Sequence, residues 1–232
     1  LPEVFCFGAD FKGISEQFKG GEAAQTTFTI KSDYMDNLSQ LSQISAVVIA
    51  HVRGKVNAGG VGLVSACDLV VADQTATFSL SELLFGLLPA QVMPFLIRRV
   101  GFQKAHRMTL RTQAVDATTA HQWGLIDELA DNSKEVLRRV LLRCGGLQKP
   151  AIKRMKTYMQ QMWEISDETK QLAVNTASSL FTDPDILEKI SRVSNLRAPA
   201  SKSAGVSLSV KEARSLYSIT ARRAASQAPI PS

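Results

Sequence analysis

Short apolar runs bounded by glycine or polar residues fill the first half of the chain. This pattern predicts strands, and the stretches between the runs have the three- and four-residue spacing of helices. Strands are expected at 4–7, 46–53, 69–72 and 76–80, and helices at about 28–41 and 60–67. Strands that alternate with helices at this spacing indicate an α/β fold.

The second half of the chain is predicted to be helical. From Gln91 onward, apolar residues recur every three or four positions, and Arg98 and Arg99 lie off this apolar stripe. Asp116 is expected to cap a further helix, and Gly124 is expected to end it. More helices are expected near 133–144, near 150–164, and from Pro184 to about Arg192.

Composition and charge indicate one main domain followed by a basic tail. The chain has 232 residues and 45% hydrophobic content, with no apolar run near the roughly 20 residues of a membrane-spanning helix. No secretory signal pattern opens the sequence, and its three distant cysteines lack metal-ligand spacing, so we expect a reduced cytoplasmic protein without a metal site. Of the net charge of +6, residues 195–232 carry +5. The nearly neutral remainder argues against nucleic-acid binding, and the tail is interpreted as a linker or peripheral helix.

The stretch "GKVNAGGVG" at residues 54–62 raises the possibility of a phosphate-binding turn. It lacks the Lys-Ser or Lys-Thr pair of a P-loop and the G-x-G-x-x-G order of a dinucleotide fingerprint, so nucleotide binding is disfavoured. The functional interpretation that remains is that Gly59 and Gly60, which have no side chains, let a ligand approach the N–H groups at a helix N-terminus. The alternative is that these glycines serve close packing alone.

A second turn, Gly8, Ala9 and Asp10, also follows an apolar run. Backbone donors from two separate turns are what an oxyanion hole for a thioester enolate requires, because neither donor has to ionise as charge develops on the oxygen. The sequence therefore permits an oxyanion hole built from these two turns.

Glu82 is the candidate proton-transfer group. If residues 76–82 are extended, Phe78, Leu80 and Glu82 share one face, and the carboxyl group lies among apolar neighbours. Burial of that kind raises a carboxyl pKa toward neutrality, where the group can take and give a proton. The alternative is an edge glutamate that only caps the following turn.

Other polar residues give weaker signals. Lys55 is either a solvated strand-end lysine or a cation that holds a substrate carboxylate near the glycine turn. Arg98, Arg99 and Arg107 form either a solvated helix face or a surface for an acidic partner. The three histidines lack the Ser, Cys or Asp partners that nucleophilic catalysis would need.

Four separated motifs resemble the crotonase (enoyl-CoA hydratase/isomerase) superfamily over about residues 4–192. They are "FCFGADF", "GKVNAGGVGLVSACDLVVAD", "ATFSLSELLFGLLPA" and "AHQWGLID". The resemblance implies a spiral of ββα units with a C-terminal helical trimerisation region, and hence a homotrimer. The core would be residues 1–145, without the family's N-terminal strands, followed by a helical region at 146–194 and the tail at 195–232. It also implies that the N–H groups of Ala9 and Gly59 stabilise the enolate of a thioester carried on a pantetheine arm.

One departure from the superfamily concerns its acid/base residues. Hydratases of this superfamily generally use two glutamates, of which the second falls on Glu82 and the first on Gly62. A water addition that uses two glutamates is therefore not expected.

Within the superfamily, "GKVNAGGVG", "SLSELLFGLLPA" and "PFLIRRVGFQKA" are most similar to the dehydratases of polyketide β-branching cassettes. That resemblance implies dehydration of 3-hydroxy-3-methylglutaryl-acyl carrier protein (ACP) to 3-methylglutaconyl-ACP, with no cofactor besides the pantetheine arm of ACP or coenzyme A. Glu82 would move the protons, and Arg98, Arg99 and Arg107 would bind the carrier. The candidate substrate-binding residues are Asp10, Lys55, Asn57 and Gly60.

Three alternatives remain open on the sequence alone. The first is a decarboxylase of the dehydrated product, which also needs an oxyanion hole but fewer proton-transfer groups. The second is a general enoyl-CoA hydratase/isomerase. The third is a carrier-binding scaffold without activity, which the glycine at position 62 permits.

Overall fold

A computed structural model of the chain describes residues 4–8, 33–181 and 183–196, and the strands within these ranges form two sheets. One sheet has the order β1-β3-β5-β6 and the other the order β2-β4-β7. All of their pairings are parallel except that of β5 with β6. The strands are β1 (Val4–Cys6), β2 (Ile49–Val52), β3 (Lys55–Asn57), β4 (Leu69–Ala72), β5 (Thr77–Ser79), β6 (Val115–Asp116) and β7 (Glu128–Leu129).

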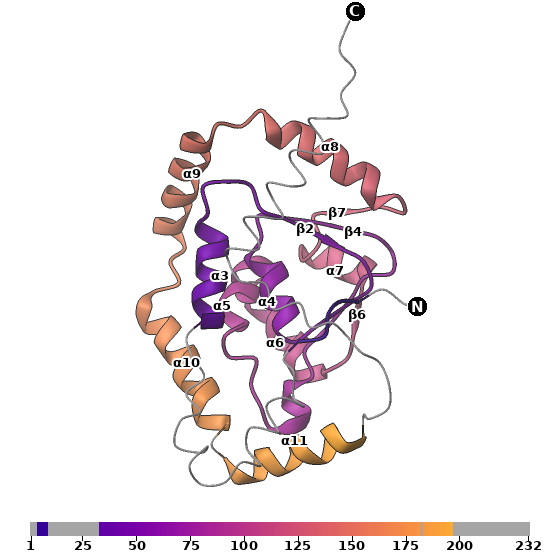
Figure 1. The fold of residues 1–232 in the computed structure, drawn as a ribbon, viewed down its shortest axis with the longest axis vertical. Helices are drawn as coiled ribbons and strands as arrows, with labels where there is room; N and C mark the ends of the chain where they lie inside the picture. The colour runs from indigo at the N-terminus through magenta and orange to yellow at the C-terminus, as the bar shows by residue number, and fades with distance from the viewer. Residues whose placement is uncertain (1–3, 9–32, 182, 197–232) are drawn as a thin grey trace, which may run out of the picture. The chain divides into compact units, whose positions relative to one another are not determined.

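Helices make up most of the remaining described chain (Figure 1). Helix α4 (Gly59–Ala66), which follows the glycine turn, contacts both α3 (Asp33–Gln43) and α5 (Met93–Val100). The others are the 3-10 helix η1 (Glu82–Phe85), α6 (Phe102–Arg111), α7 (Ala117–Trp123), α8 (Ser133–Gly145), α9 (Lys149–Met162), α10 (Asp167–Phe181) and α11 (Pro184–Leu196). No helix among the described residues is long and apolar enough to cross a bilayer.

Gly54 marks the point where the chain leaves one sheet for the other. The strand predicted at 46–53 is present as β2, but a second strand, β3, lies between it and α4, where the sequence predicted only a glycine turn. Strand β2 ends at Val52, and Gly54 turns the chain with a φ of 74° into β3, which belongs to the other sheet. The Gly54 N–H donates to the hydroxyl of Thr75 at 3.0 Å, which fixes this turn. The strand that leads into α4 is therefore β3.

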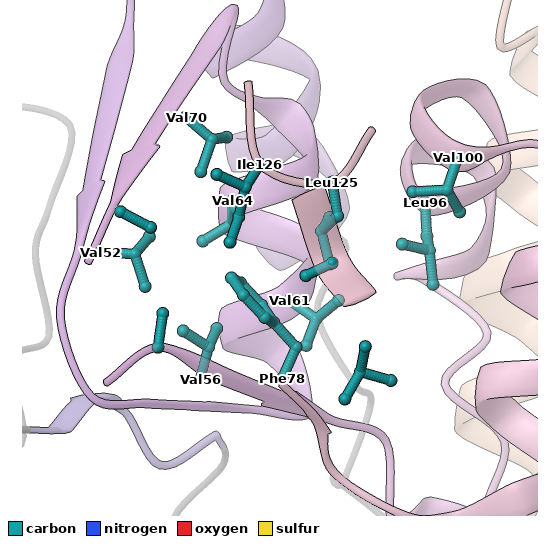
Figure 2. Close-up of a cluster of buried hydrophobic side chains, with 14 of the residues drawn as sticks. Val52, Val56, Val61, Val64, Val70, Phe78, Leu96, Val100, Leu125 and Ile126 are labelled. Carbon is teal, nitrogen blue, oxygen red and sulfur yellow. The ribbon is translucent and has the colours of Figure 1, made fainter. Parts of the chain in front are cut away.

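The main core lies where both sheets meet α4 and α5. Figure 2 shows its side chains pointing toward one another from strands, helices and the segment before β7. Most residues of α4 are buried, because this helix is covered by other elements on several sides, and its side chains are accordingly apolar around most of its surface. The labelled core residues are Val52, Val56, Val61, Val64, Val70, Phe78, Leu96, Val100, Leu125 and Ile126.

The predicted helix α7 is confirmed in its boundaries. Asp116 caps it, since its Oδ1 accepts the Thr119 N–H at 2.8 Å, and Gly124 ends it with a φ of 80° in the left-handed region. The helices expected near 133–144, near 150–164 and from Pro184 are also present. α3 is present at Asp33–Gln43, whereas the start of the predicted helix, residues 28–32, lies outside the described residues. α10 and the two-residue strands β6 and β7 were not predicted.

Helix α9 is attached to the core by a buried ion pair. Lys156 is 6% exposed, and its Nζ lies 2.6 Å from Oδ2 of Asp68. The same carboxylate oxygen accepts the Val48 N–H at 2.7 Å. The predicted linker or tail, residues 195–232, lies almost wholly outside the described residues.

Candidate active site

The end of β1 and the start of α4 lie against each other. Gly8 has a φ of +89°, and a Cβ placed on it would be 2.7 Å from the Cβ of Ala58. Ala58 itself precedes α4 with a φ of 49°, an unusual conformation for a residue with a side chain. The two turns expected to supply backbone donors are thus in contact at Gly8 and Ala58. Ala9 and Asp10 lie outside the described residues, so their roles stay predictions.

Gly59 is the first residue of α4, as the oxyanion-hole prediction requires. The N-terminus of α4 has no side-chain cap, and the first N–H groups of a helix lack acceptors within it. The partial positive charge at this end favours a developing oxyanion. The Gly59 N–H is therefore chemically suited to the predicted role.

Gly60 serves packing. A Cβ on Gly60 would lie 2.7 Å from the Cβ of Cys6 and 3.2 Å from Cγ1 of Val56, so no larger residue fits between α4 and the first sheet. For Gly60, the structure favours the packing alternative, and the predicted substrate contact has no support in these contacts.

Glu82 is buried as expected, although residues 76–82 are not one strand. β5 ends at Ser79, and Glu82 opens the 3-10 helix η1. The residue is 9% exposed, and its Oε2 has no hydrogen-bond partner among the described residues. Burial raises the pKa of this carboxyl, and backbone N–H groups of Glu82 and Ser81 only partly oppose that shift. A raised pKa makes this carboxyl better suited to both accepting and returning a proton than an exposed glutamate is.

Tyr34, at the start of α3, is a site residue that the sequence did not reveal. Its hydroxyl donates a hydrogen bond to the carbonyl oxygen of Gly59. A Cβ on Gly62 would lie 2.2 Å from the same hydroxyl oxygen, so the position where hydratases carry their first glutamate is filled by the phenol. Burial, followed by the charges of Cys6 and Glu82, raises the pKa of Tyr34 above its usual value. The glycine at position 62 was the sequence signal that pointed to such a residue, because the space left by a missing side chain in a packed core has to be filled by a side chain from another segment.

Lys55 and Asn57 lie on the face of β3 opposite the buried Val56. Lys55 is exposed, so its ammonium group is accessible to a carboxylate. The Oδ1 of Asn57 accepts a hydrogen bond from the Ser79 hydroxyl at 2.7 Å, which joins β3 to β5. Substrate binding stays a prediction for both residues, and part of the hydrogen-bonding capacity of Asn57 is already used in the sheet.

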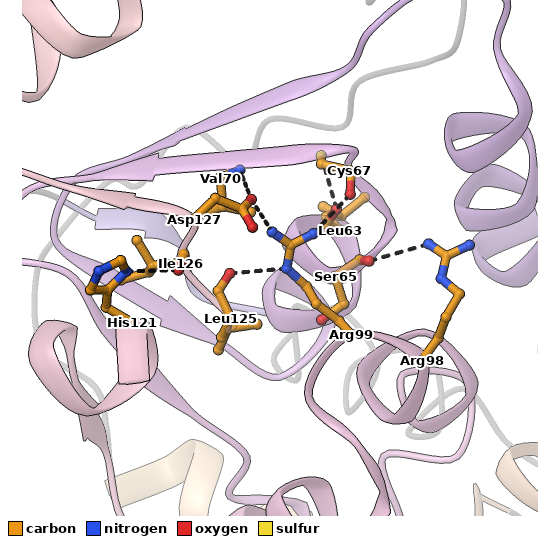
Figure 3. A network of polar contacts seen from close by, with 10 residues as sticks. All are labelled: Leu63, Ser65, Cys67, Val70, Arg98, Arg99, His121, Leu125, Ile126 and Asp127. Atoms are coloured by element: carbon orange, nitrogen blue, oxygen red, sulfur yellow. Dashed lines mark hydrogen bonds and ion pairs between the residues drawn. The ribbon is translucent and has the colours of Figure 1, made fainter. Parts of the chain in front are cut away.

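Arg99 does not belong to an exposed basic surface, which corrects its predicted carrier-binding role. Figure 3 shows its guanidinium between the end of α4 and the segment before β7. Its side chain is 9% exposed, donates to the carbonyls of Leu125 at 3.0 Å and Cys67 at 3.1 Å, and pairs with Asp127. Arg99 is therefore a structural residue.

Arg98 and Arg107 differ from Arg99 in their surroundings. Arg98 is partly buried, lies 5.4 Å from the ring of Phe95, and has its pKa lowered by burial and by the charge of Arg99. It borders a cavity of about 510 Å³ at the C-terminal end of α4, away from Gly59. Arg107 is exposed and lies 5.6 Å from the ring centre of Trp123. Carrier binding stays a prediction for these two arginines, and Arg107 is the more accessible.

Two of the histidines have structural partners. A ring nitrogen of His51 lies 2.9 Å from the hydroxyl of Ser133, and Nδ1 of His121 lies 3.0 Å from the carbonyl oxygen of Ile126. Within the described ranges, no group of three or more His, Cys, Asp or Glu side chains is placed to hold a metal ion.

Comparison with known proteins agrees with this fold. Residues 1–193 match the family model described as Enoyl-CoA hydratase/isomerase. The chain is 48% identical to the bacillaene synthase dehydratase PksH of Bacillus subtilis over 79% of its own length and 70% of that protein. It is 31% identical to the mevalonyl-coenzyme A hydratase SidH of Aspergillus fumigatus over 57% of its length and 47% of that protein.

A solved structure supports the same assignment. The crystal structure of a polyketide biosynthesis enoyl-CoA hydratase, PksH of Bacillus subtilis, matches with a TM-score of 0.78 and 46% identity. The match covers 86% of this chain and 78% of that one. The predicted crotonase-type α/β fold is thereby confirmed, whereas trimerisation stays a prediction.

Proposed function

We propose that this chain, which belongs to the enoyl-CoA hydratase/isomerase family, dehydrates 3-hydroxy-3-methylglutaryl-ACP to 3-methylglutaconyl-ACP. It is an enzyme of the hydro-lyase class, to which the dehydratase and the hydratase named above belong. The similarity to PksH, named as a dehydratase of bacillaene synthase, supports a role in a polyketide pathway. An acyl carrier protein is the proposed carrier of the substrate, and a homotrimer is the proposed assembly.

Glu82 supplies the proposed proton transfers. Its carboxylate takes a proton from C2, and the electrons of that C–H bond pass into the thioester as an enolate, whose oxygen the N–H groups of Ala9 and Gly59 stabilise. The C2=C3 double bond then forms as the C3–O bond breaks. The departing hydroxyl takes the same proton from Glu82, so that water leaves and the carboxylate is restored.

Lys55 is the proposed partner of the substrate's distal carboxylate. Its exposed ammonium group lies on β3, the strand that leads directly into the Gly59 turn. A cation there would fix the far end of the acyl chain while the thioester oxygen lies at Gly59. The substrate's second carboxylate is the chemical feature that this arrangement would select.

The observation that carries the proposal is the buried carboxyl group of Glu82 in the part of the site that the structure describes. Glu82 is buried and has a raised pKa, and the place of a second glutamate is taken by the phenol of Tyr34. One carboxyl group that carries a proton from carbon to a departing hydroxyl is enough for elimination. Among the described residues, position 62 supplies no second glutamate, so the proposed proton transfers use Glu82 alone.

The test is mass spectrometry of ACP loaded with 3-hydroxy-3-methylglutarate. The wild-type protein is expected to produce carrier that has lost one water, and Glu82→Gln is expected to abolish the loss. Glu135→Gln serves as control, because Glu135 is an exposed glutamate on α8 that pairs with Arg138 of the same helix.

Each other outcome selects an alternative. Loss of carbon dioxide from 3-methylglutaconyl-ACP would identify a decarboxylase. Rapid hydration of crotonyl-CoA without action on the loaded carrier would identify a general hydratase. Tight binding of carrier without turnover of any thioester would identify a scaffold, and full activity of Glu82→Gln would refute the role of Glu82.

A further inference from the structure

We propose that Tyr34 is a positioning residue of the oxyanion hole, whose hydroxyl holds the Gly59 carbonyl and thereby the turn that presents the Gly59 N–H. Its phenol also takes the volume that a side chain at position 62 would need. This inference rests on the proposed use of Gly59 as an oxyanion donor. It assigns a role to a residue that lies on a different helix from the turn it would hold.

The Gly59 turn needs an external anchor because its own sequence provides little rigidity. Gly59 and Gly60 have no side chains to restrict their backbone, and α4 has no side-chain cap. Ala58 is held in an unusual backbone conformation with a φ of 49°, which persists only when surrounding contacts enforce it. The Ala58 N–H donates to the Ser79 carbonyl at 2.9 Å, and Tyr34 fixes the other side of the turn at Gly59.

Tyr34 can act as an anchor because α3 is itself fixed. Met35 and Leu38 are 1% and 0% exposed and pack with Phe95 of α5. A Cβ on Gly62 would lie 3.3 Å from Cδ1 of Leu38 as well as 2.2 Å from the Tyr34 hydroxyl, so the phenol and Leu38 together fill this space. The ring therefore has little freedom to withdraw from the turn.

The phenol is a neutral donor. Its pKa is raised by burial and by the nearby charges of Cys6 and Glu82, so it keeps its proton over the pH range in which the enzyme is assayed. Removing the hydroxyl should release the Gly59 carbonyl and misplace the Gly59 N–H, which would weaken polarisation of the thioester carbonyl and slow turnover. The dependence of the rate on the ionisation of Glu82 should remain.

The first experiment uses ACP loaded with a saturated acyl group whose thioester carbonyl is ¹³C-labelled; without a C3 hydroxyl this ligand cannot be dehydrated, and the protein is used at concentrations where its complex with the loaded ACP is measured by titration. The carbonyl infrared band of the ligand is expected to shift to lower frequency in the wild-type protein and to lose a large part of that shift in Tyr34→Phe. Tyr158→Phe is the matched control, because Tyr158 is an exposed tyrosine on α9, and it should keep the full shift.

The outcomes separate the two proposals. Absence of a shift in the wild-type protein would overturn the oxyanion hole itself, and the role of Tyr34 with it. An equal shift in the wild-type protein and Tyr34→Phe would overturn the role of Tyr34 alone.

The second experiment measures dehydration of the loaded carrier. Tyr34→Phe is expected to lower kcat by about 10- to 100-fold with little change in KM, the range expected when a stabilising donor is misplaced. Gly62→Ala should displace the phenol and give a similar loss. Because both changes act through one contact, the double variant should be no slower than the slower single variant.

Losses that multiply in the double variant would contradict a shared contact. A kcat for Tyr34→Phe within about twofold of wild type would show that the hydroxyl does not position the donor. Disappearance of the acidic limb of the pH profile in Tyr34→Phe would show that Tyr34 transfers a proton, which would also overturn the positioning role.

Discussion

Replacing Arg99 with methionine should destabilise the protein strongly, although Arg99 looks like a surface residue in the sequence. The substitution keeps a long apolar stem but removes the donor to the Leu125 and Cys67 carbonyls and the cation paired with Asp127, which keeps only its hydrogen bond from the Val70 N–H among the contacts drawn in Figure 3. Breaking a buried ion pair by removing one partner typically costs about 3–5 kcal/mol. Asp127 is 35% exposed and can regain water, so the lower half of that range, about 3–4 kcal/mol, is expected.

The assay is urea unfolding of the wild-type protein and Arg99→Met, comparing the free energy of unfolding. Arg138→Met is the control, because Arg138 is a 67% exposed arginine that pairs with Glu135 on the surface of α8 and should give no measurable loss. Arg99→Lys should recover only part of the stability, since an ammonium group cannot reach both carbonyls and the carboxylate as a guanidinium does. A loss below about 1 kcal/mol for Arg99→Met would refute the reasoning, because ordinary surface changes lie below that value.

Two further predictions concern charge. Folding raises the pKa of Glu82, so its contribution to stability is fully present below the unfolded pKa of about 4.3 and is lost as pH rises through the folded pKa. Between the unfolded and the folded pKa, Glu82→Gln should therefore gain stability relative to wild type by up to about 1.4 kcal/mol per pH unit. The free energy of unfolding in urea, measured for both proteins at several pH values, tests this. A difference between the two proteins that does not change with pH would contradict the raised pKa. Arg107→Glu should weaken ACP binding and reduce the salt dependence of that binding, whereas the control Arg138→Glu should bind ACP as the wild-type protein does. Titration calorimetry at two salt concentrations measures both effects. Equal affinity of Arg107→Glu and the wild-type protein for ACP would show that Arg107 is not part of the docking surface.

The elements with strong periodicity or specific end signals could be predicted from the sequence. The apolar stripe of α5, and the capping of α7 by Asp116 and Gly124, each depend on residues within one turn or two of helix. The Gly54 crossover was missed because residues 54–62 were interpreted as one glycine-rich turn, whereas Lys55–Asn57 within it form β3 of the other sheet. Helix α10 was missed because only two of its fifteen residues are buried, which leaves a weak pattern.

The candidate site was predictable only where its chemistry is local. The glycine turn and Glu82 could be found from neighbouring residues, although Glu82 is buried at the start of a 3-10 helix and not on the face of a strand. Tyr34 and Arg99 could not be assigned, because their partners lie 25 or more residues away in the sequence. Periodicity within one helix says which face is apolar, but it does not say what covers the other face.

The pairing of β4 with both β2 and β7 has a consequence for how the protein forms during synthesis. β7 ends at Leu129, so the sheet of β2, β4 and β7 is complete only after residue 129 has left the ribosome. Until then α4, which buries most of its surface in the finished fold, has an incomplete core to pack against. A ribosome-bound chain that ends before β7 should therefore expose this helix to chaperones and be prone to aggregation, whereas chains that extend past Leu129 should be protected.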